Sequence, residues 1–124
     1  MTAPTTTQSL ESGFALKLHV LLCRPYVKGR DWYDFVWHVA RKTEPDLNLL
    51  RHALQQLGPW VGQEIEVTLR WVQENMDAAI RRIPWTAARD DVQRLLPLRE
   101  QEGLRAWSAD FFLQQLARMN DSDI

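Results

Sequence analysis

Three charged side chains stand among apolar residues between positions 17 and 41. Lys17 lies among leucines on a first expected helix, and Asp31 and Asp34 lie on a second, otherwise apolar one. Such charges need a reason, because taking each out of water costs on the order of several kcal/mol. One chemistry that they could carry is phosphate binding, with Lys17 as a point charge for an anion. The two carboxylates would then orient the lysine or help to hold a metal ion.

A basic loop joins the two expected helices and could add contacts to an anion. Its cations are Arg24, Lys28 and Arg30, which would surround the Lys17 ammonium. The alternative interpretation is structural, with Lys17 and the two aspartates locking neighbouring helices together. Breaking a buried pair of this kind typically costs about 3–5 kcal/mol, whereas an exposed pair contributes about 0–1 kcal/mol. Spacing alone favours the structural interpretation, because ion-pair networks are commoner than active sites.

The histidines and the cysteine give weaker signals. His38 continues the spacing of the two aspartates along the second helix, so it could be a general base. The sequence favours instead a hydrogen-bonded histidine that helps to neutralise the aspartates. His19 and Cys23 have the i,i+4 spacing of metal ligands, but a structural zinc site needs four, and one cysteine with three histidines makes a poor set. We therefore expect no metal site in this chain.

Composition excludes several classes of protein. The chain has 124 residues, enough for one domain with a real core. Its net charge of −1 argues against an overall electrostatic attraction to nucleic acid, so direct nucleic-acid binding by this chain alone is not expected. No apolar run approaches the roughly 20 residues of a membrane span, and the start lacks the layout of a secretory signal. A single cysteine fits a reducing compartment, so a cytoplasmic protein is expected.

Apolar periodicity predicts an all-α fold, a compact bundle of about five to six helices with an extended N-terminal tail. We expect a tail over residues 1–11, a single helical domain over 12–119 and a frayed end over 120–124. Ser12 and Thr68 are the expected caps of two helices, and residues 60–67 read as extended. The expected helices cover residues 13–22, 31–42, 47–57, 69–83, 85–96 and 104–119.

The helix of Lys17 and the run RPYVKGRDWYDFVW resemble the C-terminal helical region of AbiEii/AbiGii-type nucleotidyltransferase toxins, the toxin half of type IV toxin–antitoxin systems. Members of that group carry a lysine on a helix, a basic loop and an RDxxD motif on the next helix. Here the pattern reads as Lys17, followed by Arg30, Asp31 and Asp34. The segments GFALKLHVLLCR, GPW, DV and WSADFF are also similar, so the resemblance covers nearly all of the chain.

The resemblance implies a nucleotidyltransferase fold in two parts. An N-terminal lobe would hold the catalytic metal through paired carboxylates after a GS motif. The helical lobe would supply Lys17 for the nucleotide phosphates, with Asp31 and Asp34 orienting it or completing the acidic site. Arg24, Lys28 and Arg30 would be auxiliary anion contacts. Mg²⁺ and a nucleoside triphosphate are implied for the complete enzyme, and no cofactor for this chain alone.

This sequence differs from the family pattern in the half that binds the metal ion. This sequence has no GS motif followed by paired carboxylates, and its opening TTTQSLESGFA is similar to the end of the other lobe. Phosphoryl transfer relies on the metal for charge stabilisation, so we expect negligible transferase activity from this chain alone. Its expected partners are a separate chain or lobe that carries the nucleotidyltransferase core, or a cognate antitoxin.

Two further expectations stay open. A face of the first helix made for the other lobe would be apolar, and a homodimer is another way to cover it. The alternative function belongs to a different class, a non-enzymatic helical interaction module in which Lys17, Asp31 and Asp34 form a structural network.

Overall fold

The computed structural model describes residues 9–23 and 28–121, with only the backbone for 120 and 121. All regular structure within these ranges is helical, so the predicted all-α fold is confirmed. The elements in order are α1 (Leu10–Cys23), α2 (Gly29–Ala40), α3 (Leu47–Gln56), α4 (Leu69–Arg82), α5 (Trp85–Gln93), α6 (Leu98–Gln101), the 3₁₀ helix η1 (Glu102–Ala106) and α7 (Ala109–Asp121). None of the described helices is long and apolar enough to span a membrane.

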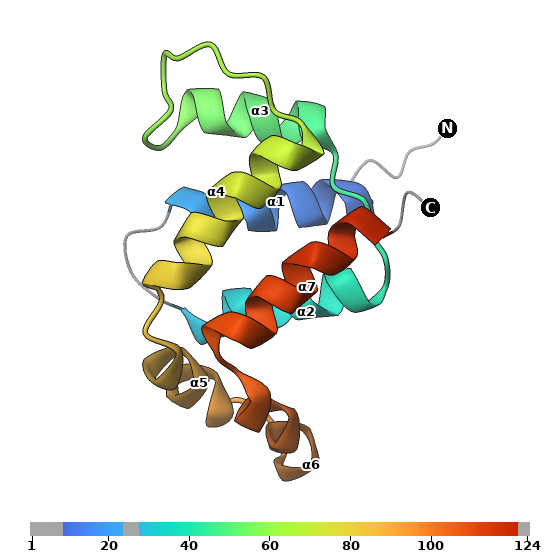
Figure 1. Cartoon of the computed structure of the whole chain (residues 1–124), viewed down its shortest axis with the longest axis vertical. Coiled ribbons are helices and arrows are strands. Elements are labelled where there is room, and N and C mark those ends of the chain that lie inside the picture. The colour runs from blue at the N-terminus through green and yellow to red at the C-terminus, as the bar shows by residue number, and fades with distance from the viewer. Residues whose placement is uncertain (1–8, 24–27, 122–124) are drawn as a thin grey trace, which may run out of the picture.

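Helix α1 is the central element of the bundle. It contacts α2, α3 and α4, while α7 packs on both α4 and α2. Figure 1 shows α4 and α7 crossing in front of α1 and α2, with α3 at one end of the molecule and α5 and α6 at the other. The two helices that carry the candidate residues are therefore neighbours, and α5 contacts the second of them.

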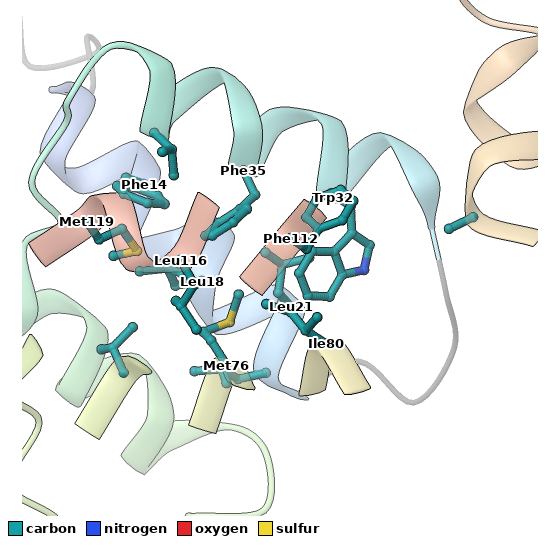
Figure 2. Close-up of a cluster of buried hydrophobic side chains, with 14 of the residues drawn as sticks. Phe14, Leu18, Leu21, Trp32, Phe35, Met76, Ile80, Phe112, Leu116 and Met119 are labelled. Carbon is teal, nitrogen blue, oxygen red and sulfur yellow. The ribbon is translucent and has the colours of Figure 1, made fainter. Parts of the chain in front are cut away.

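Aromatic side chains fill the space between these layers. Trp32 and Phe35 of α2 meet Phe112 of α7, and the rings of Trp85 and Phe112 stack with centroids 4.1 Å apart. Figure 2 shows Phe14 and Leu18 of α1 among the same group. Large aromatics bury much apolar area, and truncating one typically costs about 3–5 kcal/mol. The first two helices are therefore held by the core on one side and remain available for polar contacts on another.

The ends of several helices differ from the sequence prediction. Helix α1 begins at Leu10, and its cap is Ser9, whose Oγ accepts a hydrogen bond of 3.0 Å from the Ser12 backbone. The expectation that Ser12 caps this helix is therefore wrong. Thr68 caps α4 as expected, since its Oγ accepts from the Trp71 backbone at 3.1 Å.

The C-terminal region is more divided than the periodicity predicts. The expected helix over 104–119 is split into η1 and α7, with a break at Trp107 and Ser108. Ser108 causes the restart, because its Oγ accepts from the Phe111 backbone at 3.1 Å and so caps α7. Residues 57–68, expected to be extended in part, form turns and irregular structure.

Candidate functional site

The packing of α1 against α2 brings Lys17 between the two aspartates. Its Nζ lies 2.8 Å from Asp31 Oδ1 and 3.0 Å from Asp34 Oδ2. The side chains of Lys17, Asp31 and Asp34 are 22%, 13% and 37% exposed, so the cluster is half-buried and still open to solvent. Three of the six predicted site residues therefore meet in space.

The local sequence explains this arrangement. Asp31 and Asp34 are three residues apart on α2, so they lie on the same face of the helix. Lys17 lies next to buried Leu18 and one turn from buried Leu21 on α1, at the border of the face that packs on the core. Its stem can follow the apolar surface while its ammonium reaches the carboxylates of the neighbouring helix.

The aspartates keep Lys17 positively charged. Burial lowers its pKa, but hydrogen bonds to Asp31 and Asp34 and their charges outweigh that effect, so the pKa lies above the ordinary 10.5. A lysine in this state is neither a base nor a nucleophile at neutral pH. What it can offer to a ligand is a fixed positive charge and N–H donors.

The two carboxylates do not fit a resident metal ion. Both are directed at the Lys17 ammonium, which takes the place between them that a cation would need. Within residues 9–23 and 28–121, no group of three or more His, Cys, Asp and Glu side chains lies close enough to hold a metal. What the cluster presents to a ligand is therefore the Lys17 ammonium.

The predicted basic residues lie at the start of α2 where the structure describes them. Lys28 is the N-cap residue of α2 and Arg30 lies in its first turn. Both side chains are exposed, and both residues are close to Asp31 in the sequence. Arg24 falls outside the described residues, as does most of the connecting loop. The positions of Lys28 and Arg30 place two cations at the end of α2 that carries the site.

Sequence reasoning missed Asp91 of α5. Its Oδ2 accepts a hydrogen bond of 2.8 Å from the backbone N–H of Gly29, in the first turn of α2. Gly29 is buried, and a Cβ added there would lie 2.0 Å from the Ala88 carbonyl oxygen. The glycine within KGRD and the DV segment of the resemblance, which is Asp91 and Val92, were the available signals, and neither indicated that the two would meet across 62 residues.

His38 does not have the role that the sequence favoured. It is buried one turn beyond Asp34, with its ring stacked on Phe14 at a centroid distance of 4.7 Å. Burial lowers its pKa and outweighs the opposing charge of Asp34, and its Nδ1 has no hydrogen-bond partner among the described residues. The expectation of a hydrogen-bonded histidine that neutralises the aspartates is therefore wrong.

His19 and Cys23 contact the same backbone atom instead of a metal ion. The Leu57 carbonyl oxygen lies 2.9 Å from His19 Nε2 and 3.8 Å from Cys23 Sγ. Gly58 follows with a positive φ of 115°, and a Cβ there would lie 2.6 Å from Cys23 Sγ. This pair of side chains therefore connects α1 to the end of α3, which is a structural task.

Comparison with known families gives one match, which covers most of the chain. Residues 1–115 match the family described as "Nucleotidyl transferase AbiEii toxin, Type IV TA system". The chain belongs to this family. No significant match was found among curated proteins or among solved structures. The match confirms the predicted family. The roles of Lys17 and the RDxxD motif, and the idea that this chain is the C-terminal part of such a protein, stay predictions.

Proposed function

We propose that this AbiEii-family chain is the helical half of a nucleotidyltransferase toxin, and that Lys17 contacts the phosphates of a nucleoside triphosphate. The observation that carries the proposal is the Lys17 ammonium, on a side chain that is 22% exposed, held by Asp31 and Asp34 in a chain of this family. The two aspartates orient the amine and hold it protonated. A remaining N–H of the ammonium can then donate to a phosphate oxygen.

Charge balance makes the basic residues part of the same site. Two carboxylates against one ammonium leave the cluster with a net charge of −1, which would repel a polyphosphate. Lys28 and Arg30 add two positive charges at the start of α2, where the Asp91 carboxylate adds one further negative charge. We propose that they and Arg24 attract the phosphates, while Lys17 fixes the position of one of them.

We further propose that the chain alone transfers no nucleotide. Phosphoryl transfer relies on a metal ion for charge stabilisation, and the carboxylates of this site already hold an ammonium. A lobe with the GS motif and paired carboxylates would supply the metal, either within a longer protein or on a partner chain. The family description names a toxin–antitoxin system, so a cognate antitoxin is a second partner.

Nucleotide binding tests the role of Lys17. Titration with ATP, CTP, GTP and UTP, followed by calorimetry, should show binding of at least one nucleotide that weakens about tenfold or more in Lys17→Met, a loss of about 1.4 kcal/mol. Lys42→Met is the matched control, since Lys42 is exposed beyond the end of α2. If Lys17→Met fails to fold, Arg30→Gln tests the same site from an exposed position. Equal affinities for wild type and all three variants would contradict the proposal.

Transferase activity is tested separately. The purified chain is incubated with each labelled triphosphate, Mg²⁺ and tRNA, and we expect no label transfer. Addition of a polypeptide that carries the GS motif and paired carboxylates should restore transfer. Robust transfer by the chain alone would overturn the claim that it is inactive.

The pairing of Lys17 with Asp31 and Asp34 also favours a second function. The part-buried Lys17 cluster could be a structural lock in a non-enzymatic interaction module, because two carboxylates already account for its ammonium. In that case Lys17→Met lowers the melting temperature and no triphosphate binds to the wild type. Triphosphate binding by the wild type that is lost in folded Lys17→Met would exclude this alternative, whether or not the variant melts earlier.

A further inference from the structure

The first turn of α2 is capped by another helix. Its own N-cap residue, Lys28, makes no side-chain hydrogen bond to the turn. The carboxylate of Asp91 on α5 takes that place by accepting the Gly29 N–H at 2.8 Å. A helix start without a partner leaves backbone donors unsatisfied, so Asp91 meets a need that the local sequence leaves open.

The two helices also approach closely at this point. The backbone of Gly29 lies so near Ala88, one turn before Asp91 on α5, that any side chain at position 29 would collide with its carbonyl oxygen. Val92 is the next contact, at 3.1 Å from the position of an added Cβ. The start of α2 therefore has one tightly defined position on α5.

That position determines where Asp31 lies. Asp31 follows Gly29 by two residues, and its backbone N–H donates to the Lys28 carbonyl at 3.0 Å, so it belongs to the same turn. Its Oδ1 meets Lys17 at 2.8 Å on the neighbouring helix. A contact chain thus runs from α5 through the first turn of α2 to the ammonium on α1.

We propose that Asp91 is a positioning residue of the Lys17 site, whose hydrogen bond to Gly29 holds the first turn of α2 so that Asp31 meets the ammonium. Asp91 acts here through its hydrogen bond to the Gly29 backbone. The claim about the geometry stands alone, whereas its effect on nucleotide binding rests on the proposed function.

The decisive measurement is the pKa of Lys17 in variants of Asp91. The chain has three lysines, Lys17, Lys28 and Lys42, so the lysine side-chain signals can be assigned by substitution and followed by NMR as pH rises. In Asp91→Ala we expect the raised pKa of Lys17 to fall toward 10.5, because Asp31 is no longer held against it. In Asp91→Asn the pKa should stay near that of the wild type, because an amide oxygen still accepts from Gly29.

Asp46→Ala is the matched control for a purely structural effect. Asp46 caps α3 by accepting from the Leu49 backbone at 3.1 Å, so its loss should destabilise the protein to a similar degree without moving α2. The proposal is supported if both alanine variants melt earlier and only Asp91→Ala lowers the Lys17 pKa. It is overturned if the pKa is unchanged in Asp91→Ala, or if Asp91→Asn lowers it equally.

Nucleotide titration separates the two proposals. If the wild type binds a triphosphate, Asp91→Ala should weaken that binding about tenfold and Asp91→Asn should not, since loss of outer partners in binding sites typically has effects of this size. If no triphosphate binds to the wild type, the proposed function fails, while the pKa comparison still decides whether Asp91 positions Asp31.

Discussion

Helices α2 and α4 are of similar length, yet the cap and the ion pairs of α2 involve other helices, whereas those of α4 lie within its own segment. In α4 the cap is the adjacent Thr68, and the pair Asp77–Arg81 lies within the helix, four residues apart and exposed. In α2 the cap comes from Asp91 of α5, and the carboxylates pair with Lys17 of α1. The cap and the ion pairs of α2 therefore join three helices, whereas the cap and the ion pair of α4 lie within its own segment and its contacts to α1 and α7 come from packing and from the hydrogen bond of Gln73 to the Leu116 carbonyl.

A short distance between two charged groups does not by itself make their ion pair a large contribution to stability. Arg81 and Asp77 are 2.6 Å apart, closer than Lys17 and Asp31 at 2.8 Å. The exposed pair is screened by water and joins residues that the helix already holds together. The half-buried pair joins two helices and leaves an unpaired charge when it is broken.

The largest difference should come from Gly29→Ala. An added methyl group meets the Ala88 carbonyl oxygen at 2.0 Å, so α2 and α5 must separate, at a cost of about 3 kcal/mol of unfolding free energy. The control is Gly103→Ala, where an added Cβ meets nothing within 4 Å, so no loss is expected. Urea unfolding of both variants measures the difference. Equal stability would show that the close approach of the two helices is not required.

Removing the cation from each ion pair should give the next largest difference. Lys17→Met removes the ammonium from two partly buried carboxylates and should cost about 2 kcal/mol, less than a fully buried pair because solvent screens part of the charge. Arg81→Met should leave stability unchanged within the error of urea unfolding. Similar losses in the two variants would contradict the distinction drawn between α2 and α4.

The sequence could predict contacts between residues that lie close together along the chain, such as the cap of α4. Thr68 was recognised as a cap because its signal lies within one turn of the helix that it starts. Lys17, Asp31 and Asp34 could be grouped because their two helices follow one another and a basic loop joins them. Asp91 lies in the DV segment of the resemblance, but its role could not be predicted, because its partner is a backbone N–H 62 residues away, which leaves no pattern in the side chains.

Local sequence patterns also could not predict which polar side chains are buried. His38 follows Asp34 at helical spacing, which suggested a charged pair, but its ring is stacked on Phe14 inside the protein. Ser9 was missed as a cap because Ser12 lies closer to the first clear apolar residues of α1. For His38, tertiary packing decided against the role that the sequence favoured.

A smaller effect is expected from Thr68→Ala. The substitution removes the hydroxyl that accepts from the Trp71 backbone and should cost about 1 kcal/mol, which is typical of a lost N-cap. Thr86→Ala is the control, since Thr86 is an exposed residue inside α5 and not a cap. Thermal melting of the two variants gives the comparison. A loss at Thr68 no greater than at Thr86 would mean that α4 is held by its packing alone.

The smallest expected effect is the contribution of His38, near the end of α2, to the pH dependence of protein stability. Because burial lowers its pKa in the folded protein below the ordinary 6.5, the unfolded chain takes up the proton first as pH falls. The free energy of unfolding should therefore decrease as pH falls below about 6.5. Once pH is below the pKa of His38 in the folded protein, His38 causes no further decrease. The charges that act on His38 are Asp34, which favours its protonation, and Lys17 and Arg41, which oppose it.

A substitution of His38 by phenylalanine isolates this contribution. His38→Phe keeps an aromatic ring against Phe14 and removes the buried Nδ1, so the decrease in stability between neutral and acidic pH should become shallower. His52→Gln, an exposed change on α3, should leave the slope as it is. The slopes come from urea unfolding at a series of pH values, so a uniform offset from altered packing does not affect them. An unchanged slope in His38→Phe would mean that His38 takes up its proton equally well in the folded and unfolded chain, and that the second half of α2 depends on its neighbours through packing and not through charge.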